Sequence, residues 1–428
     1  MMRSKKSFIA LGVLTAFALS SIGFCDGVAL ALERNVIKIG VASGLKRPTG
    51  LASLQGAEMA TKEINDAGGV LGAKIQLFPA DTEQTAPKAT EAIEKLYYTD
   101  KIDTIVGAYS SEEATAFQEQ SAKLKINIIF HGTTSIMDKK YKADPEKYKY
   151  YWNYKCSDLH YLEHVLGPQL ELFVNTLKKQ LGLDKVNIAI VTDVALWAET
   201  IHVGYQEGIK ARPDCKLVYM GKISRDSVDF SAELTEMRNK GVQLILTAMG
   251  FAAGYNFVKQ TYDVRLPAMI SGINGVSWST SEFLKAVGVE AAAYNSSLGQ
   301  NSLPTTPHTA QLVKKYEQVY GGVSAEDVGS TYNGVKAYAK AVEMAGTLDH
   351  NKVQMALKKV RLPESEVWNC KEFRFDDFHR VNVSPVDGLI LYTFQFTTSG
   401  AVNILIPKEY KKGDILIPGW MVNQWRKK

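Results

Sequence analysis

Short apolar segments alternate with amphipathic segments along most of this chain. From Ile37 to Val41 every second residue is apolar, which is the period of a β-strand. Between residues 54 and 64 the apolar positions recur every three or four residues, which predicts an amphipathic helix that the pair Gly68-Gly69 ends. The first unit is therefore strand, loop and helix. In an open parallel sheet such a loop lies at the carboxyl end of its strand, where ligands bind.

The same alternation continues through two long regions. In the first, the predicted strands and helices are 74–78, 87–97, 104–106, 111–123 and 126–130. In the second, they are 186–191, 197–210, 217–220, 230–239, 244–248, 252–262 and 268–271. Strands that alternate with helices predict parallel sheets joined by right-handed crossovers. We therefore expect an α/β fold with two Rossmann-like lobes.

Breaks in this pattern give the domain boundaries. Residues 139–154 read KKYKADPEKYKYYWNY and predict a charged, aromatic connection, and residues 295–307, rich in Ser, Thr and Pro, predict the return crossing. Helices 309–320 and 331–345 then complete the first lobe, and strands 388–396 and 401–406 the second. The expected parts are lobe 1 at 36–154 plus 296–366, lobe 2 at 157–293 plus 371–420, and a C-terminal tail at 421–428.

The N-terminal residues 1–31 have the pattern of a signal peptide. Basic residues precede an apolar run from 8 to 24, and Ala29-Leu30-Ala31 is a small-x-small cleavage sequence. We expect cleavage after about Ala31 and a periplasmic protein. The alternative is a lipid anchor on Cys25, although Phe24 stands where a small residue is usually needed. No later run approaches the roughly 20 apolar residues of a spanning helix.

Charge and motifs exclude several classes of function. The formal net charge is +5, the leader takes two of these charges with it, and the rest are mixed in sign, so no basic stripe predicts nucleic-acid binding. The chain has no G-x-G-x-x-G, Walker or G-x-S-x-G motif in a fitting position, so we expect no cofactor. We also expect a monomer.

One enzyme motif remains. The sequence His160-Tyr161-Leu162-Glu163-His164 fits the H-x-x-E-H pattern of inverted zinc peptidases, and on a helix both histidines would share one face. A zinc site needs a third ligand, and so short a match arises easily by chance. We therefore favour two partly exposed histidines on an amphipathic helix, and expect no metal and no enzyme.

Polar residues follow two neighbouring strands of the first lobe. Tyr109, Ser110 and Ser111 come after one strand, and residues 131–135 (His131, Gly132, Thr133, Thr134 and Ser135) come after the next. Loops from neighbouring parallel strand ends converge, and hydroxyls with free backbone amides there can hold a small carboxylate. Capping of the following helices would also explain the Ser and Thr residues. Both interpretations can hold together.

Several segments together resemble the solute-binding proteins of branched-chain amino acid ABC importers, which are type I periplasmic binding proteins. The resemblance rests on the SG…G…GA…A…IN…AGG spacing from Ser43 to Gly69 and on the segments DTEQTAPKATEAIEKL, TIVGAYSS and IIFHGTTS, and more loosely on NIAIVTDVALWAE and YNGVKAYAKAVEMAG. It implies two lobes joined by a three-segment hinge, with the ligand between them.

The resemblance also implies a ligand-binding set. Ser110, Ser111, Gly132 and Thr134 match the positions that hold the ligand's α-carboxylate, and Trp197 stands where the family has a stacking tyrosine. As an isolated Trp at a helix start, Trp197 would be part of the core about as often. Further candidates from matching loops are Ser43, Phe251 and Tyr332.

Two departures from the family put the ligand's ammonium group in doubt. Asn274 replaces the acidic residue that balances the ammonium, and a buried ammonium without a counter-charge is strongly disfavoured. Thr49 stands where the family has an aromatic wall, and nearby Arg47 either reaches a ligand carboxylate or is exposed beside Lys46. The resemblance implies a branched-chain or other amino acid as the ligand, and the two departures add a related small carboxylate or amide as a competitor.

Three cysteines follow the leader: Cys156, Cys215 and Cys370. In an oxidising compartment two of them can pair. The resemblance places Cys156 and Cys370 on crossing segments that run side by side, and so implies a disulfide between these two.

Together these observations predict an exported protein that closes on a small ligand and delivers it to the permease and ATPase subunits of an ABC importer. The alternative is a binding module of the same fold that reports its ligand to a signalling receptor. A remote alternative is a zinc hydrolase that uses His160 and His164.

Overall fold

The structure is a computed structural model that describes residues 32, 34–132, 134–300, 303–322 and 326–426. The predicted leader 1–31, with Cys25 in it, and Thr133 lie outside the described residues. Within the described part of the chain, no helix has both the length and the apolar character needed to cross a bilayer.

The first lobe is built on a five-stranded parallel sheet with the order β2-β1-β3-β4-β5. The strands are β1 (Val36–Ser43), β2 (Lys74–Asp81), β3 (Thr104–Gly107), β4 (Ile128–Phe130) and β5 (Tyr151–Asn153). The three inner strands are buried almost throughout, as parallel strands covered on both faces must be.

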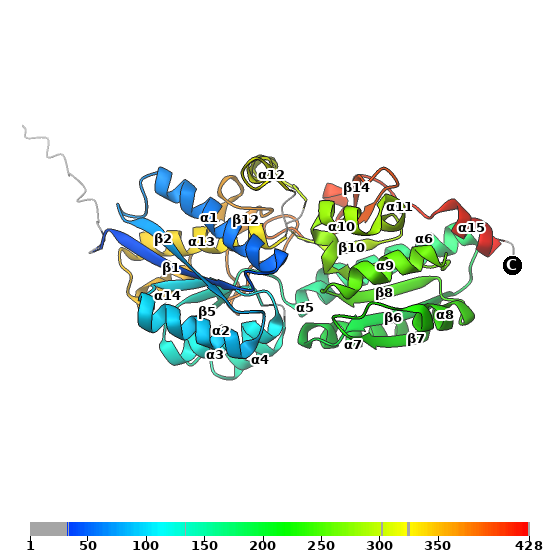
Figure 1. Cartoon of the computed structure of the whole chain (residues 1–428), viewed down its shortest axis with the longest axis horizontal. Helices are drawn as coiled ribbons and strands as arrows, with labels where there is room; N and C mark the ends of the chain where they lie inside the picture. The colour runs from blue at the N-terminus through cyan, green and yellow to red at the C-terminus, as the bar shows by residue number, and fades with distance from the viewer. Residues whose placement is uncertain (1–31, 33, 133, 301–302, 323–325, 427–428) are drawn as a thin grey trace, which may run out of the picture. The chain divides into compact units, whose positions relative to one another are not determined.

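Helices cover both faces of this sheet (Figure 1). On one face lie α1 (Pro48–Asp66) and α13 (Glu326–Ala345), and on the other α2 (Ala86–Lys95), α3 (Ser111–Leu124) and α4 (Ile136–Ala143). Gly68 and Gly69 follow α1 with positive φ angles, so the glycine stop is confirmed. The remaining elements near this lobe are η1 (Leu96–Asp100), α12 (Pro307–Tyr320), α14 (His350–Leu357), β11 (Leu362–Pro363), η4 (Glu364–Glu366) and β12 (Glu372–Phe373).

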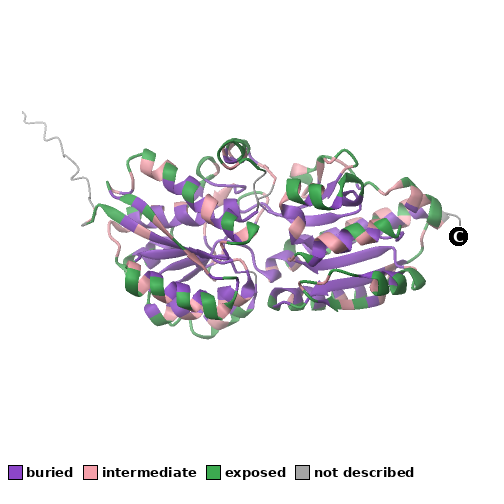
Figure 2. Ribbon diagram, in the orientation of Figure 1, coloured by how far each residue is buried: buried purple, intermediate pink, exposed green. Residues whose placement is uncertain are grey.

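The second lobe has a four-stranded parallel sheet with the order β7-β6-β8-β9. Its strands are β6 (Val186–Asp193), β7 (Cys215–Ile223), β8 (Leu244–Met249) and β9 (Met269–Asn274). Its helices are α5 (Asp158–Tyr161), η2 (Leu162–Leu166), α6 (Gly167–Leu181), α7 (Leu196–Lys210), α8 (Ser231–Asn239), α9 (Ala253–Asp263), η3 (Gly275–Trp278), α10 (Thr280–Val287) and α11 (Val289–Ala292). Figure 2 shows most strands of both sheets buried and the outer helix faces exposed, and the edge strands β2 and β7 are only partly buried.

An antiparallel sheet extends the second lobe. It joins β10 (Ser296–Gly299), β13 (Tyr392–Phe396) and β14 (Val402–Ile406), followed by η5 (Lys408–Tyr410) and α15 (Gly419–Arg426). A bridge between Ile270 and Asn295 connects it to β9. The parallel two-lobed α/β fold expected from the sequence is confirmed.

Three boundary predictions are wrong in detail. Residues 139–154 are no irregular connection, because they contain most of α4 and all of β5, which adds a fifth parallel strand. Residues 296–299 form β10 with the second lobe, so the return crossing begins after Gly299 and not at 296. Of the segment expected as a tail, residues 421–426 belong to α15, and Met421 is fully buried.

The chain crosses between the lobes at three places, and hydrogen bonds connect the crossing segments. The thiol of Cys156 donates to Oε1 of Gln300 over 2.8 Å, and Nδ2 of Asn369 donates to the backbone carbonyl of Gln300 over 2.9 Å. Segments about 70 and 140 residues apart in sequence therefore lie side by side. Three crossing segments that lie side by side are the geometry of a hinge.

The predicted disulfide between Cys156 and Cys370 is not formed. Both residues are buried free thiols, and Cys215 is also free. Each buried thiol has its own hydrogen-bond acceptor, Gln300 for Cys156 and the carbonyl oxygen of Glu372 for Cys370. The segments of Cys156 and Cys370 each contact the Gln300 segment, the first through the Cys156 thiol and the second through Asn369, and no bond between the two sulfur atoms joins them.

Candidate functional site

The strand ends of the two parallel sheets supply the residues of a shared site. From the first lobe, Tyr109 and Ser110 follow β3, His131 follows β4 and Lys155 follows β5. From the second lobe, Trp197 follows β6, the pair Gly250-Phe251 follows β8, and Trp278 ends η3 after β9. In open α/β sheets ligands bind at the carboxyl ends of the strands. Each lobe thus contributes the carboxyl ends of its parallel strands to one shared site.

We call the enclosed space between these residues the inner cavity. It is lined by Tyr109, Ser110, His131, Lys155, Tyr161, Trp197, Gly250, Phe251 and Trp278. About 370 Å³ among these side chains is empty, but only about 30 Å³ can be occupied by the centre of a water molecule. As it stands the cavity admits water and no larger solute. A solute therefore needs the lining to move.

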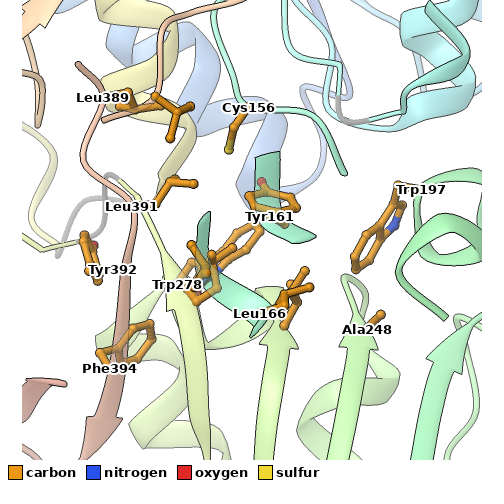
Figure 3. Close-up of a cluster of buried hydrophobic side chains, with 14 of the residues drawn as sticks. Cys156, Tyr161, Leu166, Trp197, Ala248, Trp278, Leu389, Leu391, Tyr392 and Phe394 are labelled. Carbon is orange, nitrogen blue, oxygen red and sulfur yellow. Dashed lines mark hydrogen bonds between the residues drawn. The ribbon is translucent and has the colours of Figure 1, made fainter. Parts of the chain in front are cut away.

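Aromatic rings form most of the lining. Figure 3 shows Tyr161, Trp197 and Trp278 within one buried cluster, with Tyr161 between the two tryptophans in this view. The ring of Tyr109 meets those of His131 and Phe251 edge to face, with centroids 5.4 and 6.3 Å apart. Flat apolar walls of this kind suit a flat apolar solute.

A larger, more polar space opens beside the inner cavity, and we call it the outer cavity. It is lined by Arg47, Pro48, Thr49, Glu83, Gln84, Thr85, Tyr109, Arg225, Asp226, Gly250, Phe251, Ala252, Tyr255, Gly275, Val276, Ser279 and Glu282. Water can occupy about 430 Å³ of it. Tyr109, Gly250 and Phe251 line both cavities, so they form the wall between them.

Two polar contacts join the lobes at this wall. The hydroxyl of Tyr109 donates to the backbone carbonyl of Gly250 over 3.0 Å. Arg225 forms an ion pair with Glu112 of α3 and lies over the ring of Phe251, 4.3 Å from its centroid. The lobes are therefore in contact where the two cavities meet.

Lys155 is the charged residue at the inner cavity. Its side chain is fully buried, with Nζ 2.8 Å from Glu326 Oε1, 3.9 Å from Asp327 Oδ1 and 4.7 Å from the centroid of the Trp278 ring. The approach to Glu326 makes an ion pair without the angles of a hydrogen bond, and Nζ has no hydrogen-bond acceptor among the described residues. A buried ammonium with unused donors is unusual in a folded protein.

Burial shifts the proton affinities of the groups around Lys155. It raises the pKa of Glu326 to about 7, although the Lys155 ammonium acts in the opposite direction. It lowers the pKa of His131 to about 4, with Lys155 lowering it further and Asp327, 2.9 Å from Nδ1, opposing the shift. His131 is therefore neutral at physiological pH, and Glu326 is near its midpoint.

Two hydroxyls of the first lobe, those of Ser110 and Thr134, bond to backbone N–H groups at helix starts. Ser110 is the N-cap of α3 and accepts from the backbone N–H of Glu113, whose carboxylate accepts in return from the N–H of Ser110. Thr134 Oγ1 accepts from the N–H of Ile136. The capping interpretation is thus confirmed for Ser110, whereas the N-cap of α4 is Ser135 and its side chain makes no cap hydrogen bond. Ser110 also lines the inner cavity, and Thr134 does not.

The structure brings together some of the predicted site residues and separates others. The inner cavity contains Tyr109, Ser110, His131, Trp197 and Phe251, and the outer cavity Arg47 and Thr49. Six line neither cavity, namely Ser43, Ser111, Gly132, Thr134, Asn274 and Tyr332.

Two of those six have partners elsewhere that explain their positions. The hydroxyl of Tyr332 contacts Glu63 on α1, because Tyr332 lies within α13 and faces the other long helix of the first lobe. Asn274 is buried at the end of β9, and its Nδ2 donates to Asn295 Oδ1 over 3.2 Å.

Sequence reasoning missed four residues of the inner cavity: Lys155, Tyr161, Gly250 and Trp278. Lys155 follows the stretch taken for a connection, so the strand that positions it was not recognised. Trp278 ends the same segment as Asn274, and its Nε1–H donates to the carbonyl of Leu298. Recognition of β5 as a strand would have indicated Lys155, since it lies just beyond a strand end.

The H-x-x-E-H segment does not have the geometry of a metal centre. Nδ1 of His160 accepts from the backbone N–H of Ser157 over 3.1 Å and the ring is buried, whereas His164 is exposed in the π-helical turn η2. Burial lowers the pKa of His160 to about 3. Within the described ranges, no three His, Cys, Asp or Glu side chains are grouped as a metal ion would need. The expectation of two partly exposed histidines is therefore wrong for His160, which caps its helix.

Comparisons with known proteins agree with this architecture. The family described as periplasmic binding protein matches residues 36–386. Leu/Ile/Val-binding protein homolog 7 of Brucella abortus (strain 2308) is 24% identical over 338 residues, which cover 76% of this chain and 80% of that protein.

Two solved structures show the same fold. A putative branched-chain amino acid ABC transporter from Silicibacter pomeroyi is similar with a TM-score of 0.73 and 20% identity, over 90% of this chain and 99% of that one. A solute binding protein from R. palustris, in complex with 4-hydroxybenzoate, is similar with a TM-score of 0.70 and 16% identity, over 90% of this chain and 98% of that one.

Proposed function

Because the chain belongs to the periplasmic binding protein family, we propose that it captures a small solute between its two lobes and delivers it to an ABC importer. The protein binds and releases the solute without making or breaking a bond. The solute is an amino acid or a related small carboxylate or amide. Relatives of both kinds support this range, since one is named for Leu, Ile and Val and another was solved with 4-hydroxybenzoate.

The inner cavity is the observation that carries this proposal. Tyr109 and His131 enter it from the first lobe, and Trp197 and Phe251 from the second. A solute held there contacts both lobes at once and so stabilises the state in which they are together. A solute with micromolar affinity supplies about 8 kcal/mol in all, part of which stabilises the closed hinge.

Movement of the lobes is supported by how they are connected. Besides the three crossing segments, polar contacts at the rim connect them, among them the Tyr109 hydrogen bond and the Arg225–Glu112 ion pair, and the ring of Tyr109 meets that of Phe251. Contacts of this kind are worth on the order of 1 kcal/mol each. A bound solute can therefore decide between open and closed states.

Delivery to an importer requires export and a membrane partner. We propose that residues 1–31 direct export and are removed after about Ala31, and that the mature monomer then meets the permease and ATPase subunits of the importer. A sensory role for the same fold would use a receptor in their place. Uptake of labelled solute by cells with and without this gene separates the two, since only the transport role makes uptake depend on it.

The test of solute capture is a thermal-shift and calorimetric screen of the mature protein against amino acids, aromatic and aliphatic acids, and amides. A solute that binds raises the melting temperature by mass action. Its affinity is expected to fall at least tenfold in Trp197→Ala, because Trp197 lines the inner cavity. It is expected to stay unchanged in the control Trp425→Ala, because Trp425 donates to the backbone carbonyl of Pro267 and lines neither cavity. Equal affinity in both variants would contradict the proposed site.

A further inference from the structure

The titratable side chains at the inner cavity are arranged in two layers. Lys155 and His131 line the cavity, whereas Glu326 and Asp327 approach Lys155 and do not line it. The acids are therefore behind the lysine as seen from the cavity. His131 has its pKa lowered to about 4, so at neutral pH the charge that faces the cavity is the ammonium of Lys155.

The ammonium of Lys155 is placed to accept an anion. It is fully buried and lies 2.8 Å from Glu326 Oε1, and its N–H donors have no acceptor with hydrogen-bond angles among the described residues. Leaving charged donors unsatisfied in a buried site is costly, and a carboxylate oxygen is the acceptor that offsets this most strongly. The adjacent wall is apolar, with the rings of Tyr161, Trp197 and Trp278.

We propose that Lys155 binds the carboxylate of a solute whose body is flat or branched and apolar, and which carries no ammonium group. This inference rests on the proposed function and names the solute class of the same site. An α-ammonium next to the carboxylate would meet Lys155 itself, and none of the described acidic side chains lines the inner cavity to balance it. Repulsion between two buried cations strongly disfavours that arrangement.

The small volume of the inner cavity means that its wall must open before a solute can enter. The 30 Å³ open to water centres is less than a benzene ring or an isobutyl group needs. The wall of Tyr109 and Phe251 must therefore part from the inner cavity before the solute enters, and the larger outer cavity is the approach. Lys155 lies between β5 and α5, on the first segment that crosses between the lobes.

The test compares solutes that differ only in the ammonium group. Calorimetric titration of the mature protein with 4-methylpentanoate against leucine, and with 3-phenylpropionate against phenylalanine, is expected to show the acid of at least one pair binding at least tenfold more tightly than its amino acid. Amino acids that bind as tightly as the acids, or acids that do not bind at all, would overturn the inference.

Variants then test Lys155 directly. Lys155→Met is expected to reduce the affinity for the preferred acid at least tenfold. Because that variant leaves Glu326 buried without its cation, the double variant Lys155→Met/Glu326→Gln keeps the buried charge balanced and is expected to lose the same affinity. The matched control is Lys336→Met, since Lys336 also pairs with a glutamate and lies over a tyrosine ring but lines neither cavity.

The outcomes separate this inference from the proposed function. Unchanged affinity for the acid in a folded double variant would overturn the role of Lys155 and leave solute capture in place. If leucine or phenylalanine binds and the matching acid does not, the role of Lys155 is likewise overturned and solute capture is left in place. If a solute binds the Lys155 variants and Trp197→Ala as tightly as the wild type, the inner cavity is not its binding site. That result would contradict the proposed function as well.

Discussion

The hydroxyl of Tyr109 donates to the backbone carbonyl of Gly250 over 3.0 Å, although the two residues are 141 positions apart. Tyr109 follows a strand of the first lobe and Gly250 a strand of the second, so this bond spans the space between two independent sheets. Both residues also line both cavities. The bond therefore connects lobe closure to the wall that a solute must pass.

Tyr109→Phe is expected to weaken solute binding by about two- to tenfold. The substitution removes the hydrogen bond to Gly250 and keeps the ring, and one such bond contributes about 0.5–1.5 kcal/mol to the state that contains it. Calorimetric titration measures the change. Tyr98→Phe is the control, because Tyr98 is exposed on the same lobe. A Tyr109→Phe protein that binds as tightly as the wild type would show that this contact does not stabilise the closed state.

Arg225→Gln is expected to lower the affinity by no more than about fivefold and to reduce its dependence on salt. The ion pair between Arg225 and Glu112 is about 30% exposed on both sides, and pairs of this kind contribute on the order of 1 kcal/mol or less. Salt screens them. Lys222→Gln, which breaks a pair within the second lobe, should leave both quantities unchanged. A steeper salt dependence in Arg225→Gln would count against the pair as a lobe contact.

Much of the fold follows from the sequence because its signals are local. Alternating strand and helix periods indicated both parallel sheets, and the glycine pair ended α1 as expected. Short strands in unusual composition were the exception. Strand β5 is three residues long and lies in a lysine- and tyrosine-rich stretch, so its buried face could not be recognised from period alone.

The site could be predicted only in part for a related reason. Residues that follow predicted strands, such as Tyr109 and Trp197, were found because strand ends converge by topology. Lys155 was missed along with its strand, and Tyr332 was assigned from a matching segment although it faces the α1 side of its helix. Which helix face points at a ligand depends on packing, and packing is settled by residues far away in sequence.

The buried thiols are expected to be unreactive in the folded protein. Burial raises the pKa of Cys156 to about 12 and that of Cys370 further still, so neither forms the thiolate that reacts. In a protein that lacks residues 1–31, Ellman's reagent should detect no more than the half-buried Cys215 before denaturation and three thiols after it. Recovery of a Cys156–Cys370 peptide under non-reducing conditions would contradict the structure.

Glu326 is expected to make stability depend on pH. Its pKa is raised from 4.5 to about 7, so the folded state binds this proton more tightly than the unfolded state. The contribution is complete below about pH 4.5 and is lost as the pH rises through about 7. Lys155 and Asp327 are the charged groups that face Glu326, while Tyr161 and Cys156 nearby stay protonated in this range.

Denaturant unfolding of the wild type and of Glu326→Gln between pH 5 and pH 8 isolates this group, since Asp138 and Asp193, whose pKa values are raised to about 6, titrate in both proteins. The free energy of unfolding of the wild type, relative to the variant, should be higher at pH 5 than at pH 8. Parallel pH profiles for the two proteins would mean that Glu326 does not titrate in this window.

The central claim is that one solute is held by both lobes and draws them together. X-ray scattering from the mature protein, with and without a saturating solute found by calorimetry, measures this directly. The account predicts that the radius of gyration falls on binding, and that it falls less in Tyr109→Phe at the same saturation. An identical scattering curve for the free protein and for the fully bound protein would contradict it.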